Sequence, residues 1–289
     1  MPPSGFLRSA ERVAISQGSA RGDIPRVTVD IERARREIVG VGRRLYERGL
    51  VAGAEGNVSV RLDGARVLAT PAGASKGFLD PEALVVTDMV GRALAGAGRP
   101  SSELRMHLRI YALRPDVHAV VHAHPPTATG FAIAGLSFDA CVVPEIVSTL
   151  GRVPLVPYGT PSTQELPDRL APYVAAHDAL LLANHGAVAY GPSLAGAINA
   201  MESIEQAARS MLVAHLLGRV NLLSREDVDR LLTLDAYGAH PRNPGCTVAG
   251  TEPLGGPRSE ASGPAPMRDG TLEREVAEIV REALGRSRP

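Results

Sequence analysis

Apolar residues that recur every three or four positions predict the first helix of the chain. These apolar positions are Ile31, Ala34, Ile38, Val41 and Leu45. Such a spacing places them on one face of an α-helix, where they can be buried together. Asp30 precedes the run as a candidate N-cap, and Gly49 follows it as a stop. We therefore expect a helix between Asp30 and Gly49 that packs against a core.

A longer helix is predicted from Ser193 to Leu217. Ser193 suits an N-cap and Gly218 suits a C-terminal stop. The apolar stripe of this helix consists of Leu194, Ile198, Met201, Ile204 and Ala208. A second amphipathic stretch, from Leu272 to Leu284, predicts a last helix. Its apolar face is expected to pack on its own subunit or on a neighbouring one.

Other parts of the chain have the patterns of strands. Residues 58–62 alternate, Asp63 and Gly64 favour a tight turn, and residues 66–70 return, so a β-hairpin is expected. The apolar run from Ala179 to Ala183 predicts a short buried strand. A helix is expected over about 102–113, and the strand that follows it runs into residues 117–125.

Composition divides the chain into four parts. Residues 1–27 contain no apolar core of a signal peptide and are expected to form a flexible extension. One domain is expected over residues 28–237. Glycine, proline and small polar residues dominate 238–270, which predicts a linker. Residues 271–289 then carry the last helix.

Charge and composition narrow the classes of partner. The 31 lysine and arginine residues balance 31 aspartate and glutamate residues, so no overall field favours nucleic acid or an anionic membrane. No run approaches the roughly 18 apolar residues that span a bilayer. Cys141 and Cys246 lie far apart in sequence, so we expect no disulfide and a cytoplasmic location. The expected partners are a small molecule and further copies of the chain.

Three histidines form the strongest candidate for a chemical site. His122 and His124 lie two positions apart on a predicted strand, so they leave the same face with Cα atoms about 6.6 Å apart. His185 lies in an Asn-His-Gly turn directly after the buried strand predicted from Ala179 to Ala183. Three neutral imidazoles suit Zn²⁺, and a catalytic zinc site keeps a further position open for water or substrate. The spacing therefore predicts a metal site.

The other histidines are expected to be structural. His118 has the same strand parity as His122 but lies about 13 Å away along the strand, which is too far for a shared coordination sphere. The remaining histidines are expected on helix surfaces or in loops, and they are His107, His177, His215 and His240.

Five short motifs follow one another along the chain. They are Gly-Asn-Val-Ser at 56–59, Thr-Pro-Ala-Gly at 70–73, Ser-Ser-Glu at 101–103, His-Ala-His at 122–124 and Asn-His-Gly at 184–186. In order and spacing they resemble the class II aldolase/adducin family, most closely in type its L-fuculose-phosphate aldolases, from about Asp30 to Tyr237. The resemblance implies an α/β fold, a three-layer α/β/α sandwich around a central, largely antiparallel sheet. It also implies a homotetramer with active sites between neighbouring subunits.

The resemblance assigns a role to each site residue. The ligands of Zn²⁺, or of another divalent metal, would be His122, His124 and His185. Glu103 would join the metal when the site is empty and act as an acid or base when substrate binds. Tyr237 would act on the aldehyde oxygen. The phosphate pocket would consist of Asn57, Gly73, Ser101 and Ser102, and helix N-termini do favour anions.

Several of these residues also have a plain structural interpretation. Glu103 is favourable in the first turn of a helix, because it complements the macrodipole. Ser101 and Ser102 can cap that helix. Tyr237 can be an ordinary packing residue.

The sequence departs from the fuculose-phosphate pattern at two places. Ala54 and Ala72 stand where hydroxyl residues contribute to the phosphate pocket. No tyrosine lies near residues 142–145, where the aldolase has one that affects stereochemistry, and Glu145 is close to that position. We therefore expect the sugar-facing half of the site to differ from that of the aldolase. The substrate need not be a deoxy-sugar phosphate.

The activity that the resemblance implies is that of a zinc-dependent lyase of carbohydrate metabolism. It would cleave a ketose 1-phosphate to dihydroxyacetone phosphate and an aldehyde through a metal-stabilised enediolate. A pentulose-phosphate 4-epimerase and a ketose-phosphate dehydratase are alternatives on the same metal site. Glu103 favours the aldolase or the dehydratase, since the epimerases commonly have aspartate there. A non-catalytic adducin-like scaffold is disfavoured, because such heads have lost the metal ligands that this chain retains.

Overall fold

The computed structural model describes residues 30–234 and 245–249 of the 289-residue chain. The predicted N-terminal extension, Tyr237 and the helix expected from Leu272 lie outside the described residues. Among the helices that are described, none is long and apolar enough to cross a membrane.

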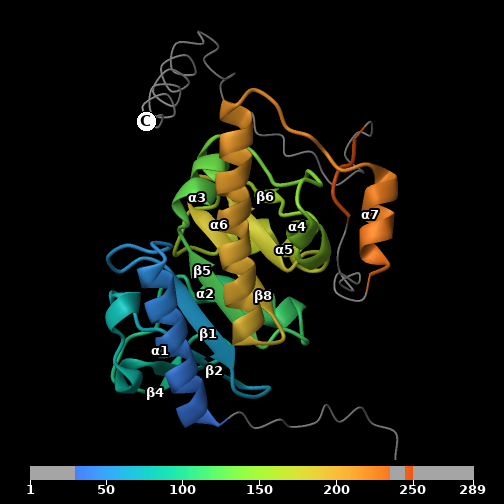
Figure 1. Cartoon of the computed structure of the whole chain (residues 1–289). Helices are drawn as coiled ribbons and strands as arrows, with labels where there is room; N and C mark the ends of the chain where they lie inside the picture. Colours follow the sequence, from blue (N-terminus) through green and yellow to red (C-terminus); the bar gives the residue numbers. More distant parts are fainter. Residues whose placement is uncertain (1–29, 235–244, 250–289) are drawn as a thin grey trace, which may run out of the picture.

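An eight-stranded sheet forms the centre of the described chain (Figure 1). Its spatial order is β4-β3-β2-β1-β5-β8-β7-β6. Neighbouring strands are antiparallel except for the parallel pair β6 and β7, so the expected largely antiparallel sheet is confirmed. The strands are β1 Asn57–Arg61, β2 Arg66–Ala69, β3 Val85–Asp88, β4 Ala93–Ala95, β5 Ala119–Ala123, β6 Leu155–Val156, β7 Ala179–Leu182 and β8 Gly186–Gly191.

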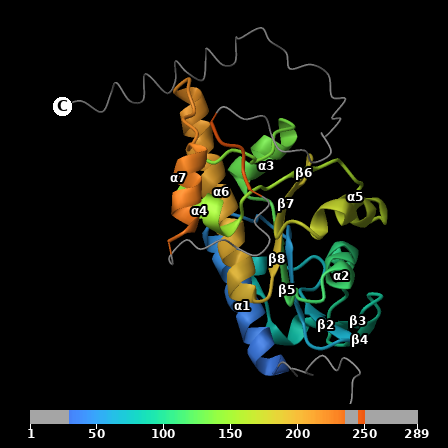
Figure 2. The same ribbon diagram turned by 90° about the vertical axis from the view of Figure 1, so that its right-hand side faces the viewer.

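Helices lie on both faces of this sheet, and Figure 2 views the sheet nearly edge-on between them. The α-helices are α1 Ile31–Glu47, α2 Leu104–Leu113, α3 Pro126–Ile133, α4 Pro144–Thr149, α5 Glu165–Val174, α6 Leu194–Leu216 and α7 Arg225–Leu232. Two short 3₁₀ helices are η1 Lys76–Phe78 and η2 Pro81–Ala83. Helices α1, α3 and α6 pack on one face, whereas α2 and α5 pack on the other.

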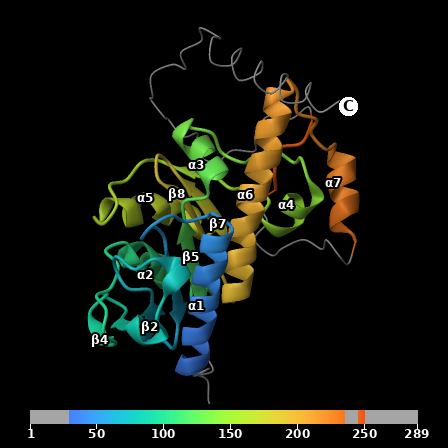
Figure 3. The same cartoon turned by 60° about the vertical axis from the view of Figure 1, so that its left-hand side comes forward.

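The two faces form separate cores because successive strand side chains point to opposite sides. On β5, Val121 belongs to the core under α1 and α6, and its neighbour Val120 belongs to the core under α2 and α5. Helices α1 and α6 run side by side over the first face (Figure 3). Most strands of the sheet are thus buried on both sides, whereas the edge strand β4 is exposed.

The elements with the clearest sequence patterns are confirmed. The Asp30 carboxylate accepts a hydrogen bond from the Glu32 N–H at the start of α1, and Gly49 adopts a positive φ of 67° after it. The Ser193 hydroxyl accepts from the Gly196 N–H at the start of α6. Strands β1 and β2 form the expected hairpin.

The expectation that the two cysteines stay unpaired is wrong. Cys141 and Cys246 form a disulfide across 105 positions of sequence. The Cys141 N–H donates to the Thr247 carbonyl at 2.9 Å, so residues 245–249 of the predicted linker lie against the loop before α4. Separation along the chain therefore did not measure separation in space. The cysteines therefore no longer support the expectation of a reducing compartment.

Candidate metal centre

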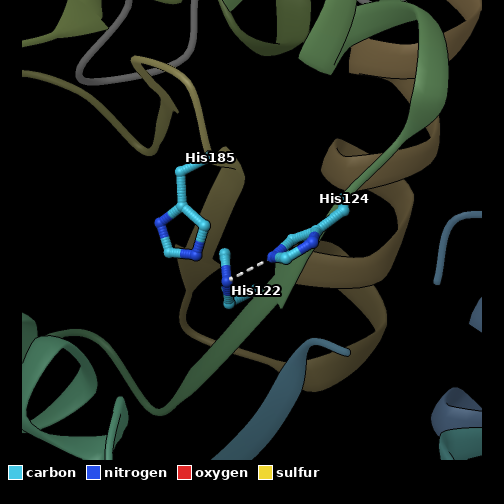
Figure 4. Close-up of side chains that lie close together, drawn as sticks. All are labelled: His122, His124 and His185. Carbon is cyan, nitrogen blue, oxygen red and sulfur yellow. Dashed lines mark hydrogen bonds between the residues drawn. The ribbon is translucent and has the colours of Figure 1, made fainter. Parts of the chain in front are cut away.

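Three strands bring the predicted histidines together at one end of the sheet (Figure 4). His122 lies on β5, His124 lies just beyond that strand, and His185 lies in the turn between β7 and β8. Since β8 pairs with both β5 and β7, the turn at His185 is held beside the end of β5. One ring nitrogen from each histidine lies within 4.8 Å of the other two. The spacing rule and the turn motif thus placed the three residues correctly.

The Asn-His-Gly turn has a specific backbone reason. Asn184 adopts a positive φ of 56°, a left-handed conformation that asparagine tolerates better than most residues. A Cβ atom at Gly186 would lie 2.5 Å from the Ala123 carbonyl oxygen and 2.8 Å from a ring carbon of His124. Only glycine therefore lets β8 approach β5 closely enough to present His185.

The hydrogen bonds of the histidines orient their free nitrogens. Nδ1 of His122 lies 2.8 Å from the Ala187 carbonyl oxygen and donates to it. The lone pair of that ring then resides on Nε2, which faces the cluster, as in metal-bound histidines held by a carbonyl. Nε2 of His122 and Nε2 of His124 are 3.2 Å apart. Nδ1 of His185 is buried and has no hydrogen-bond partner within the described part of the chain.

Glu103 lies against these histidines. Its Oε1 is 3.0 Å from Nε2 of His185, and its Oε2 is 3.5 Å from Nε2 of His122. The side-chain amide of Asn57 donates to Oε2 at 2.8 Å. Glu103 occupies the N-cap position of α2, but its carboxylate makes no capping hydrogen bond there. The carboxylate is therefore directed at the histidine cluster and not at its own helix.

Burial favours the neutral form of His122 and His124. It lowers the pKa of His122 to about 3, and the charge of Glu103 only partly opposes this. Burial is also the main reason that the pKa of His124 is lowered. For Glu103, burial favours the protonated form, but the hydrogen bonds with His185 and Asn57 hold its pKa below the usual range. Neutral imidazole is the form that binds a metal ion.

The arrangement fits a divalent metal. Three imidazole nitrogens converge, the partner of His122 fixes its tautomer, and a carboxylate stands beside them. Imidazole with carboxylate is a donor set typical of zinc enzymes. His122, His124 and His185 would hold the ion, and Glu103 is near enough to join or leave it.

Two of the four predicted phosphate residues, Asn57 and Ser101, lie next to Glu103. Asn57 contacts Glu103 as described, and Ser101 accepts a hydrogen bond from the Glu103 N–H at 3.3 Å. The Ser102 hydroxyl lies 2.6 Å from that of Ser162. Gly73, after β2, adopts a positive φ of 72°. Ser101 thus contacts the N-cap residue of α2, and no side-chain capping hydrogen bond is formed at that N-cap.

Some site features were missed or mislocated from the sequence. Nδ1 of His124 lies 3.6 Å from a carboxylate oxygen of Glu55. Glu55 directly precedes the Gly-Asn-Val-Ser motif, and this position was the only sequence signal for it. Lys76 is buried near the cluster, and no spacing pointed to it. His107, expected on a helix surface, is buried on α2 with its Nδ1 2.7 Å from the Ser59 hydroxyl. Glu145 is exposed on α4.

The sequence also matches a known family model. Residues 36–212 match the model described as Class II Aldolase and Adducin N-terminal domain. This range includes the three histidines and Glu103. It ends within α6, before Tyr237.

Two curated proteins illustrate the similarity. The 3-oxo-tetronate 4-phosphate decarboxylase of Pectobacterium atrosepticum is 35% identical over 206 residues, which cover 69% of this chain and 93% of that protein. The 5-deoxy-D-ribulose 1-phosphate aldolase of Bacillus thuringiensis is 32% identical over 211 residues, which cover 72% of this chain and 98% of that protein. Decarboxylation was not among the activities expected from the sequence.

A solved structure shares the fold. An L-fuculose 1-phosphate aldolase structure superposes with a TM-score of 0.63 at 30% identity, covering 69% of this chain and 94% of the other. The resemblance to L-fuculose-phosphate aldolases drawn from the five motifs is therefore confirmed.

Proposed function

This chain belongs to the class II aldolase and adducin family, and on that premise we propose that it is a metal-dependent lyase that forms dihydroxyacetone phosphate from a phosphorylated keto compound. The convergence of His122, His124 and His185 beside Glu103 carries the proposal. The family includes several reactions, so the site residues have to decide which bond breaks.

The metal is proposed to be Zn²⁺, held by the three histidines, and another divalent ion that binds imidazole can take its place. When bound, it supplies a Lewis acid that stabilises negative charge on the carbonyl oxygen of the substrate. The burial of His122 keeps water away from one side of the cluster.

Glu103 is proposed to move the proton at the reacting carbon. Bond cleavage beside a ketone leaves an electron pair on the neighbouring carbon, and this carbon must gain a proton to give dihydroxyacetone phosphate. Asn57 holds the Glu103 carboxylate through its 2.8 Å hydrogen bond. The contact with His185 is one of those that hold the pKa of Glu103 below its usual range. A positioned carboxyl group is suited to general acid or base catalysis.

Decarboxylation of a 3-oxo-tetronate 4-phosphate is the reaction that we favour. The C1–C2 bond breaks, CO₂ leaves, the electron pair remains on C2 beside the C3 ketone, and C2 takes one proton. One positioned acid is enough for this sequence, and Glu103 can provide it. The similarity to the P. atrosepticum decarboxylase supports the same substrate class.

Aldol cleavage of a ketose 1-phosphate is the second candidate. Here the C3–C4 bond breaks, the C4 hydroxyl loses its proton to give an aldehyde, and C3 gains one. A second group must act at the aldehyde oxygen, and we assign this role to Tyr237, which lies outside the described residues. The similarity to the B. thuringiensis aldolase supports this candidate.

The substrate phosphate is proposed to lie between Asn57, Gly73, Ser101 and Ser102, close to the first turn of α2. Helix N-termini and hydroxyl groups are suited to bind anions. We also propose a homotetramer in the cytoplasm, with sites shared between subunits. The exposed apolar side chains near the end of α6 support self-association, and they are Leu212, Val213 and Leu217.

Product analysis tests the proposal. The zinc-loaded full chain is incubated separately with 3-oxo-tetronate 4-phosphate and with a panel of ketose 1-phosphates, and the products are identified by NMR spectroscopy. Dihydroxyacetone phosphate with CO₂ supports decarboxylation, and dihydroxyacetone phosphate with an aldehyde supports aldol cleavage. Epimerised or dehydrated products, or no dihydroxyacetone phosphate from any substrate, would overturn the proposal. Glu103→Gln protein with its metal retained is the matched control.

A further inference from the structure

Lys76 is unusual because the sequence contains no other lysine and because its side chain is buried. It is the only lysine among the 31 lysine and arginine residues. Its side chain lies at the start of η1 and the residue is only 1% exposed. Nζ donates to the carbonyl oxygens of Ala54 and Ala74, at 2.9 and 2.6 Å. No carboxylate of the described residues forms an ion pair with it. A buried cation that no carboxylate contacts directly is costly, so its retention needs a reason.

The two carbonyls belong to the segments that border the proposed phosphate pocket. Ala54 lies three residues before Asn57, and Ala74 follows Gly73 directly. The ammonium group therefore ties the approach to β1 to the segment after β2. The backbone of Lys76 also packs closely against α1. The approach is so close that a Cβ atom at Gly42 would lie 2.5 Å from the Lys76 carbonyl oxygen. The charge thus has a fixed place beside the pocket.

The charge of Lys76 also acts on the histidine site. It is one of the influences that lower the pKa of His124. Burial lowers the pKa of Lys76 itself to about 8, and the charge of Glu103 opposes that shift. None of the four residues of the proposed phosphate pocket carries a positive charge.

A purely structural role does not account for the charge. Two carbonyl oxygens can be satisfied by any neutral donor, such as a side-chain amide, at a lower desolvation cost. A buried ammonium group becomes favourable when an anion is bound close to it. A phosphate dianion in the pocket is such an anion.

We propose that Lys76 is a positioning residue for the phosphate group of the substrate, which joins the two segments of the pocket and supplies its fixed positive charge. This inference rests on the proposed function, because that function places the phosphate between Asn57 and Gly73. It adds a residue outside the five motifs to the site. It also explains how a pocket with alanine at positions 54 and 72 holds an anion.

Phosphate binding by the metal-free full chain tests the inference, because no metal can then hold the anion. Inorganic phosphate is titrated by calorimetry into wild-type protein, Lys76→Met and Arg43→Met. Arg43 is exposed on α1, so its variant matches the change in net charge away from the pocket. Lys76→Met is expected to weaken phosphate binding roughly 10- to 100-fold, the usual effect of losing a charge-assisted contact. Arg43→Met is expected to bind like wild type. Equal affinities in Lys76→Met and wild type would overturn the inference.

A second measurement needs no variant. Protein labelled with ¹³C-lysine gives a single lysine spectrum, because Lys76 is the only one. Its side-chain signals are expected to shift as inorganic phosphate saturates the metal-free wild-type protein. Unchanged signals at saturation would overturn the inference, whether or not Lys76→Met folds.

Kinetics separate a role in phosphate binding from a merely structural role. In the zinc-loaded enzyme, Lys76→Met is expected to raise KM by a similar factor while kcat and metal content stay near those of wild type. A fall in kcat with loss of metal would mark Lys76 as structural only. The binding tests do not depend on turnover. A Lys76-dependent phosphate site in a chain that forms no dihydroxyacetone phosphate would therefore reject the proposed function and keep this inference.

Discussion

Two histidines are buried among the described residues, and they differ in what surrounds their ring nitrogens. His107 on α2 is 1% exposed, and His122 on β5 is fully buried. Burial lowers the pKa of each to about 3. The Ser59 hydroxyl lies 2.7 Å from Nδ1 of His107 and 2.9 Å from the Tyr111 hydroxyl, so this group is a compact hydrogen-bonded network. Around His122, by contrast, several ring nitrogens face one another.

The contrast shows that burial and a shifted pKa do not identify a metal site. Both regions have them. The distinguishing feature is that three ring nitrogens lie within 4.8 Å of one another, with a carboxylate at their side. Ring nitrogens that face each other can share one proton or bind one cation, and Nε2 of His122 and Nε2 of His124 are 3.2 Å apart. The region of His107 is expected to stabilise the fold, and the region of His122 is expected to bind metal.

The largest effect is expected from removing a proposed ligand. His124→Ala should lose nearly all of about one bound Zn²⁺ per chain, since two imidazoles make a much weaker site than three. Activity should fall below detection. Elemental analysis after dialysis measures the metal, and His118→Ala is the control on the same segment. If His124→Ala kept its zinc, the assignment of the ligands would be wrong.

Glu103→Gln is expected to separate acid catalysis from metal binding. Turnover should fall by roughly 10²- to 10⁴-fold, the usual contribution of a positioned acid or base. The amide keeps the size of the side chain, so metal content and fold should be preserved. Steady-state kinetics beside elemental analysis gives both quantities. Near wild-type turnover would reduce Glu103 to a helix-start residue, and loss of metal would make it chiefly a ligand.

His107→Leu should have the opposite profile. It leaves the Ser59 hydroxyl without its histidine partner in a buried place, at an expected cost of about 1–3 kcal/mol in the free energy of unfolding. Metal content should not change, because His107 lies outside the cluster. Urea denaturation measures the cost. A variant of wild-type stability that lost zinc would reverse the roles of the two regions.

The smallest effect near neutral pH concerns the titration of His107. Its pKa is about 3 in the folded protein, and the value for an exposed histidine is near 6.5. The unfolded chain therefore binds more protons as the pH falls below about 6.5, and the stability contributed by the neutral ring is lost toward the folded pKa. Metal-free wild type should lose stability between those values more steeply than metal-free His107→Leu. Parallel pH profiles would contradict the buried, neutral state of His107.

Sequence alone brought the three candidate metal ligands together because its signals are local. The parity of His122 and His124 follows from strand geometry, and the turn around His185 has its own residue pattern. Glu103 was identified through a motif. Helices α1 and α6 were also predicted, since each has an N-cap and an apolar stripe.

Features that depend on contacts across the fold were not predicted. His107 is buried because α2 packs over Ser59 of β1, and nothing around position 107 specifies that partner. The disulfide joins two segments 105 positions apart, and Lys76 reaches two segments through space. The short helices α3 and α4 have no stripe long enough to be recognised. The roles of Tyr237 and of the last helix stay predictions.

X-ray absorption at the zinc edge of the loaded full chain tests the central claim most directly. The account predicts about three imidazole nitrogens at roughly 2.0–2.1 Å, with any remaining ligand an oxygen. His185→Ala should lower the number of imidazoles or abolish zinc binding, and His107→Leu should leave the spectrum unchanged. A spectrum with sulfur ligands, with a single imidazole, or unaltered in His185→Ala would contradict a metal centre formed by His122, His124 and His185.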